Sequence, residues 1–230
     1  MVILAHRGYS AKFFENTLTA FKKAFEFGAD GVELDLRSTR DNQIVVVHDD
    51  NLERFCGINV KISDLNLREL REYSREGEKI PSFEEVLSII PPGKILNVEL
   101  KERTPAESAL QAVRKLFSPQ NTIVSSFDHD LISFLIKRHP DFKFGFLVGE
   151  ELRNDPIGLI RSLLEEKPYS IHLPVQLVDY PQYFESICTA IKSKKVDIYI
   201  YTVNDPDKCV RFANMVDGII TDEVEKFVTL

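Results

Sequence analysis

Short runs of aliphatic and β-branched residues alternate along this chain with longer segments whose apolar positions recur every three or four residues. The short runs predict strands, and the longer segments predict amphipathic helices. Alternation of this kind from end to end is typical of βα units around a parallel sheet. The hydrophobic pattern therefore predicts an α/β fold.

Eight strands are expected, at residues 2–6, 31–37, 94–101, 122–126, 142–147, 169–173, 197–203 and 218–221. Helices are expected between them, at 17–27, 106–117, 129–138, 156–166, 183–194 and 206–214. Eight βα units predict a TIM (β/α)8 barrel, and a chain of 230 residues suits one such domain spanning 1–230.

The region from about 38 to 90 departs from this pattern and is interpreted as a small insertion after the second strand. Residues 44–47 follow Asp41-Asn42 and look like the second arm of a hairpin opened by a turn. Short helices are expected at 67–73 and 83–90, behind the polar residues that precede them.

Charge and cysteine content exclude several classes of protein. A net charge of -7 without clustered Lys and Arg argues against a nucleic-acid partner. Three widely spaced cysteines without a C-x-x-C pair suggest neither a disulfide framework nor a zinc site. No long apolar run suggests a signal peptide or a stable membrane insertion, so a soluble cytoplasmic protein is expected. Nothing in the sequence specifies an oligomeric state.

Two of the predicted barrel strands contain carboxylates, although the strands of parallel barrels are normally apolar on both faces. Glu33, Asp35 and Arg37 alternate with aliphatic residues and share one face of the second strand, and Glu99 and Lys101 repeat the feature in the third. A half-exposed edge strand would explain the second strand alone, but not the repetition. Because active sites of barrels lie at the carboxyl ends of the strands, we interpret these positions functionally.

Three converging carboxylates would repel each other unless a cation lay between them. Glu33, Asp35 and Glu99 are therefore the candidate metal ligands. Oxygen ligands without nearby Cys or paired His favour one hard divalent cation, Mg²⁺ or Ca²⁺, over Zn²⁺.

Two histidines accompany these carboxylates. His6 closes the first strand, and His48 precedes Asp49, whose carboxylate could orient the imidazole. A lone histidine at a strand end is more often structural, but two beside a metal suit phosphodiester cleavage, with one as acid and one as base. Arg7 and Lys101 are candidate phosphate contacts. His129, His139 and His172 are expected to be structural.

With these residues assembled, the sequence resembles the glycerophosphodiester phosphodiesterase family over nearly its whole length. The matching elements, in order, are His6-Arg7-Gly8, Glu15-Asn16-Thr17, residues 28–35, His48-Asp49, residues 97–101, Ser125-Ser126-Phe127, Thr202-Val203-Asn204 and Thr221-Asp222. The resemblance implies a TIM barrel that hydrolyses glycerophosphodiesters to an alcohol and sn-glycerol 3-phosphate. It also implies the metal, acid/base and phosphate-binding roles given above. Family mechanisms commonly pass through a cyclic phosphate, and direct attack by water is the alternative.

Three positions differ from the family pattern. Phe14 replaces the usual Pro, Asp41-Asn42 replaces Asp-Gly in the hairpin turn, and Tyr201 replaces the usual Trp. Tyr201 keeps an aromatic wall for the substrate but adds a hydroxyl, so the fit of the glycerol or alcohol group is expected to change. The rival hypotheses are a lysophospholipase D-like enzyme on the same barrel and a phosphate-binding protein without turnover.

Overall fold

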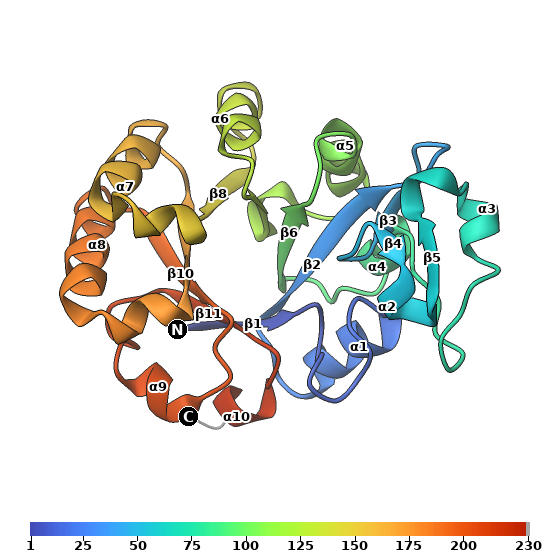
Figure 1. Ribbon diagram of the computed structural model, residues 1–230, viewed down its shortest axis with the longest axis horizontal. Coiled ribbons are helices and arrows are strands. Elements are labelled where there is room, and N and C mark those ends of the chain that lie inside the picture. The colour runs from blue at the N-terminus through green and yellow to red at the C-terminus, as the bar shows by residue number, and fades with distance from the viewer. Residues whose placement is uncertain (229–230) are drawn as a thin grey trace.

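The first strand, β1 (Val2–His6), pairs in parallel with both β2 (Gly31–Ser38) and β11 (Gly218–Thr221), and this double pairing closes the sheet. The computed structural model describes residues 1–228. Its larger sheet has nine strands, and all but β3 are parallel members of the closed ring. The protein is therefore the predicted (β/α)8 barrel, with helices around the strands (Figure 1).

The remaining strands of the barrel are β6 (Ile95–Leu100), β7 (Thr122–Ser126), β8 (Lys143–Leu147), β9 (Ser170–Pro174) and β10 (Asp197–Tyr201). The helices are α1 (Leu18–Glu26), α2 (Glu53–Cys56), α3 (Leu67–Leu70), α4 (Phe83–Leu87), α5 (Ala106–Leu116), α6 (His129–Arg138), α7 (Pro156–Glu165), α8 (Pro181–Ser193), α9 (Pro206–Val210) and α10 (Glu225–Val228). All eight predicted barrel strands and all six predicted helices between them are confirmed, although several boundaries moved.

The short helices α3 and α4 were predicted to reach residues 73 and 90, and each ends three residues earlier. Two boundaries of the barrel helices were wrong for local reasons. Helix α8 begins at Pro181, two residues before the predicted start, because proline has no N–H to leave unpaired in the first turn. Helix α9 ends at Val210, because the residues up to Met215 continue as turns rather than as helix. Strand β10 also ends early, at Tyr201. Val203 lies beyond the strand, although its N still donates to Ile220 O of β11.

The stretch between β2 and β6 carries the extra elements. Strand β3 (Ile44–Val46) pairs antiparallel with the end of β2, and Asn42 adopts φ 57° in the turn, as the hairpin prediction requires. A second hairpin of β4 (Asn51–Leu52) and β5 (Ile58–Lys61) was not predicted. These elements form the lobe beside the barrel at the right of Figure 1.

This lobe has a small apolar core of its own, separate from the main core between the barrel and its helices. Its buried members are Val45, Val47, Leu52, Phe55, Ile62, Leu70 and Ile80. Phe14, from the loop after β1, packs against this cluster and meets the Phe55 ring edge-on at 5.5 Å. The Phe14 contact joins the lobe to the barrel loop that carries Glu15 and Asn16.

Candidate active site

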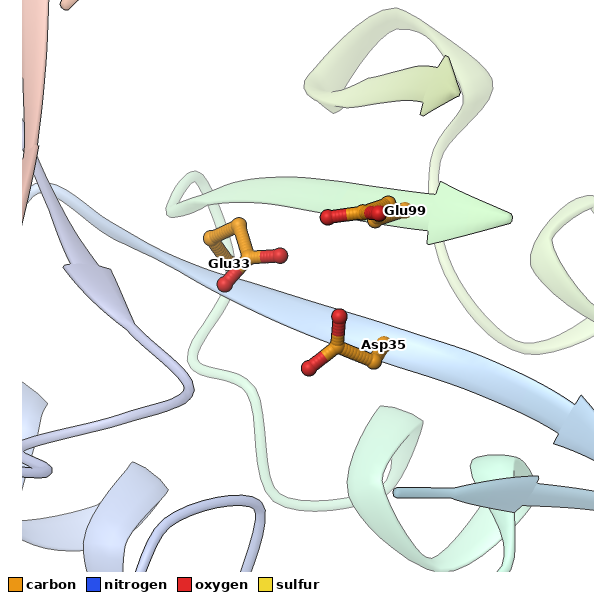
Figure 2. Close-up of side chains that lie close together, drawn as sticks. All are labelled: Glu33, Asp35 and Glu99. Carbon is orange, nitrogen blue, oxygen red and sulfur yellow. The ribbon is translucent and has the colours of Figure 1, made fainter. Parts of the chain in front are cut away.

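A buried carboxylate triad, defined as Glu33, Asp35 and Glu99, lies between the middle of β2 and the carboxyl end of β6. Asp35 and Glu99 are partners in the register of the two strands, and period two places Glu33 on the same face as Asp35. One oxygen from each carboxylate lies within 4.8 Å of the others. Figure 2 shows the three carboxylates directed into one common space between the strands.

Burial makes this arrangement electrostatically costly. Burial and the neighbouring charge of Asp35 raise the pKa of Glu33 to about 8, and the same two causes raise the pKa of Glu99. Asn16 Nδ2 donates to Asp35 Oδ2 at 2.8 Å, whereas Asp35 Oδ1 is buried without a hydrogen-bond partner. An unpaired buried carboxylate oxygen beside two other carboxylates is a suitable site for a hard cation. These residues fit a divalent metal.

His6 lies beside the triad at the end of β1. Its Nδ1 donates to Asp222 Oδ1 at 2.7 Å, and its Nε2 faces Glu33 Oε2 at 4.0 Å. Burial opposes the charged imidazole, but the Asp222 hydrogen bond and the Glu33 charge outweigh it and raise the pKa of His6. Asp222 also accepts from Ser10 Oγ and Asn204 Nδ2. Asp222 therefore fixes the ring so that Nε2 remains directed at the triad.

The backbone after His6 turns sharply, which brings Arg7 over the carboxylates. Arg7 and Gly8 both have positive φ, of 56° and 80°. A Cβ on Gly8 would lie 2.6 Å from the backbone carbon of Ala20 in α1, so only glycine fits there. The turn also directs Arg7 N at Glu33 Oε2, at 3.1 Å.

Both predicted phosphate contacts lie against the triad. Arg7 Nε is 3.2 Å from Asp35 Oδ2, and Lys101 Nζ donates to Glu99 Oε1 at 2.6 Å. Each of these basic side chains is only 16% exposed. Their partly buried positive charge offsets some of the repulsion within the triad.

His48 lies near Glu99, where its charge partly offsets the burial and the Asp35 charge that raise the pKa of that carboxyl. Its Nδ1 donates to Asp49 Oδ1 at 2.7 Å. Although burial opposes ionisation, Arg54 and His48 lower the pKa of Asp49 to about 2. Each candidate histidine is thus held at Nδ1 by an ionised aspartate.

Arg54, in α2 of the lobe, has a role that the sequence did not indicate. Its Nε donates to Asp49 Oδ2 at 2.5 Å, while its terminal nitrogens lie 2.7 Å from both oxygens of Glu15. Glu15 also accepts from Arg7 Nη1 at 2.9 Å. One guanidinium therefore supports His48 through Asp49 and Arg7 through Glu15. Glu15 belonged to a family-like motif, but no local signal distinguishes Arg54 from the other basic residues of the lobe.

Replacement of Arg54 by Met is expected to lower kcat by roughly 10- to 100-fold. This range is typical of residues that orient active-site side chains without contacting the substrate. Lys in place of Arg54 is expected to restore little, because one ammonium cannot reproduce the fork that binds Glu15 and Asp49 together. In an Arg54→Ala variant, which leaves room for a small cation, added methylguanidinium should partly restore kcat. Unchanged kcat, or full recovery with Lys, would contradict this positioning role. Arg40→Met is the matched control, since Arg40 pairs with Glu69 in the same lobe.

Tyr201 differs from the other predicted residues in how it is held. Its hydroxyl donates to the carbonyl of Val148 at 2.6 Å rather than facing the triad, and burial raises its pKa. Its ring meets Phe127 nearly at right angles, with the centroids 6.2 Å apart. The hydroxyl that distinguishes Tyr201 from the usual Trp therefore binds the loop after β8.

The other histidines lie outside this group. His129 Nε2 donates to the Leu147 carbonyl, and His139 pairs with Glu107 between α5 and α6. His172 is fully buried against Tyr199, and burial lowers its pKa to about 3.

Comparison with known proteins identifies relatives over the whole chain. The family model described as the glycerophosphoryl diester phosphodiesterase family matches residues 6–226. A glycerophosphodiester phosphodiesterase of Caldanaerobacter subterraneus subsp. tengcongensis is 31% identical over 250 residues, covering 100% of this chain and 97% of that protein.

Solved structures agree with this match. The crystal structure of the Thermotoga maritima glycerophosphodiester phosphodiesterase has a TM-score of 0.90 and 40% identity, covering 100% of this chain and 97% of its own. A phosphodiesterase structure from Oleispira antarctica, in complex with the product sn-glycerol-3-phosphate, has a TM-score of 0.83 and 24% identity. The match covers 100% of this chain and 96% of that chain.

Proposed function

This chain belongs to the glycerophosphoryl diester phosphodiesterase family, and we propose that it hydrolyses glycerophosphodiesters to an alcohol and sn-glycerol 3-phosphate with a bound divalent cation and two histidines. The observation that carries this proposal is the buried triad with His6 near Glu33 and His48 near Glu99. The product named for the Oleispira antarctica relative supports the identity of the phosphate product.

Glu33, Asp35 and Glu99 are the residues that would hold the cation, Mg²⁺ or Ca²⁺. When bound, a divalent cation supplies Lewis-acid stabilisation of negative charge on the phosphoryl oxygens. Arg7 and Lys101 supply further positive charge at the same place, Arg7 with a planar fork and Lys101 as a point charge.

His6 and His48 are proposed to move the protons. Asp222 and Asp49 occupy the two Nδ1 atoms, so each imidazole has Nε2 left to exchange a proton with the substrate. One histidine removes a proton from the attacking oxygen, and the other protonates the leaving alcohol. The attacking oxygen is either water, which gives sn-glycerol 3-phosphate directly, or a glycerol hydroxyl, which gives a cyclic phosphate that water then opens.

We further propose that residues 1–230 form one domain in which the lobe between β2 and β6 is an insertion. The family match over residues 6–226 and the contacts of Phe14 and Arg54 between lobe and barrel support this division. Residues 229–230 lie outside the part that the structure describes. Within the described part, no helix combines the length and apolar character needed to cross a bilayer.

The proposed reaction is tested with a panel of glycerophosphodiesters, with separate assays for sn-glycerol 3-phosphate and for the free alcohol. Equal amounts of both products are expected from each substrate that is hydrolysed. Release of choline from lysophosphatidylcholine faster than from glycerophosphocholine would favour a lysophospholipase D-like enzyme instead. Binding of sn-glycerol 3-phosphate without turnover of any diester would identify a non-catalytic protein.

A further inference from the structure

Three groups that the proposed chemistry does not use converge beside the triad, and we call them the head-group corner: Phe127, Tyr201 and Glu151. Phe127 follows the end of β7, Tyr201 ends β10, and Glu151 follows β8. Carboxyl ends of parallel barrel strands meet at one end of the barrel, which is also the end that holds the triad. Glu99 is the partner of Ser125 in the register of β6 and β7, which places Phe127 two residues beyond it.

Gly149 shows how closely the three groups approach one another. A Cβ built on Gly149 would lie 3.3 Å from the Phe127 ring, 3.6 Å from Glu151 Oε2 and 3.8 Å from the Tyr201 hydroxyl. Glu151 Oε1 accepts from Gly149 N at 2.9 Å, which holds the carboxylate in this position. The absence of a side chain at Gly149 leaves the ring, the carboxylate and the hydroxyl around one small space.

The rings of Phe127 and Tyr201 are held by contacts with their neighbours, and no Lys or Arg within residues 1–228 covers their faces. The hydrogen bond from Tyr201 to Val148 fixes one ring, and the other meets it at 84°. Phe127 is 45% exposed, so its ring is accessible to a ligand. Elsewhere Lys or Arg lies over six aromatic rings, but within residues 1–228 none lies over Phe127 or Tyr201.

The local charge is negative. The charges of Glu99 and Glu151 both act on the Tyr201 hydroxyl. Two basic residues lie near Glu151. Arg153 pairs with Glu150 at 3.3 Å, and His129 Nε2, which donates to the Leu147 carbonyl, is 3.8 Å from Glu151 Oε1. Aromatic faces together with a carboxylate favour an organic cation over an anion.

We propose that the head-group corner binds the cationic alcohol half of the substrate, so that the enzyme prefers glycerophosphodiesters whose head group carries an ammonium. This inference rests on the proposed phosphodiesterase function and adds the substrate class to it. The phosphoryl group lies at the triad, and the ammonium lies against the rings of Phe127 and Tyr201 with Glu151 beside it.

The test compares glycerophosphocholine with its neutral isostere, the glycerophosphodiester of 3,3-dimethylbutanol, which replaces the nitrogen by carbon and keeps the shape. We expect kcat/KM to be roughly tenfold higher for the charged substrate, with the difference mainly in KM. Phe127→Leu and Glu151→Gln should each bring this ratio toward one. Phe134→Leu and Glu150→Gln are matched controls, because Phe134 is 50% exposed on α6 and the Glu150 side chain is 84% exposed.

The outcomes separate this inference from the function on which it rests. Equal kcat/KM for the two substrates in the wild type would overturn the ammonium preference and leave the phosphodiesterase function intact. An ammonium preference that survives both corner substitutions would overturn the assignment of the corner. Failure to hydrolyse either substrate in the presence of divalent cations would overturn the proposed function and this inference together.

Discussion

Chelation of divalent cations is expected to lower kcat for glycerophosphodiester hydrolysis by on the order of 1000-fold or more. The reason is that a cation contributes several kcal/mol of stabilisation to a charged phosphoryl transition state, and each ~1.4 kcal/mol corresponds to a factor of ten. Glu33, Asp35 and Glu99 place three carboxylates in one buried space. Arg7 and Lys101 supply two positive charges for the three.

The measurement restores Mg²⁺, Ca²⁺ and Mn²⁺ separately to chelator-treated enzyme. Binding to the native state should also raise the melting temperature of the wild type, and this second readout does not depend on turnover. Asp35→Asn is expected to lose most of both responses, because it neutralises the central carboxylate of the triad. Glu150→Gln, which removes an exposed carboxylate, should retain both. Chelated enzyme that keeps near its original kcat would rule out the metal.

Replacement of either His6 or His48 by Ala is expected to lower kcat by about 100- to 10,000-fold, the usual range for general acid or base groups. The geometry of the two histidines supports the same outcome for both, since each ring is held at Nδ1 by an aspartate and leaves Nε2 free to exchange a proton. His139→Ala is the control, because His139 pairs with Glu107 between two outer helices. Near wild-type kcat in both active-site variants would exclude the proposed acid/base pair.

A change of leaving group then separates the acid from the base. A 4-nitrophenyl diester releases a stable anion that needs no proton in the transition state. The variant that lacks the general acid should therefore recover much of its kcat with this substrate, and the variant that lacks the base should not. Equal defects of both variants with both substrates would contradict a division of roles between His6 and His48.

Much of the fold followed from short-range pattern. The parallel strands of a barrel are buried on both faces, so they stand out as compact apolar runs between amphipathic helices. The hairpin at Asp41-Asn42 followed from turn chemistry, and the structure confirms it. The β4–β5 hairpin was missed because its strands are two and four residues long and show no alternation of buried and exposed positions.

The sequence by itself predicted the metal, acid/base and phosphate candidates at one end of a barrel. Polar residues in and after barrel strands are easily recognised because they interrupt an otherwise apolar pattern. Only the tertiary structure decided what orients them. Asp222 meets His6 across 216 residues when β11 closes on β1, and Arg54 meets Glu15 across 39. Such pairs cannot be recognised from the local sequence, because the fold alone decides which residues distant in the chain lie close together. The ring of strands likewise brings Phe127, Tyr201 and Glu151 together from the ends of β7, β10 and β8.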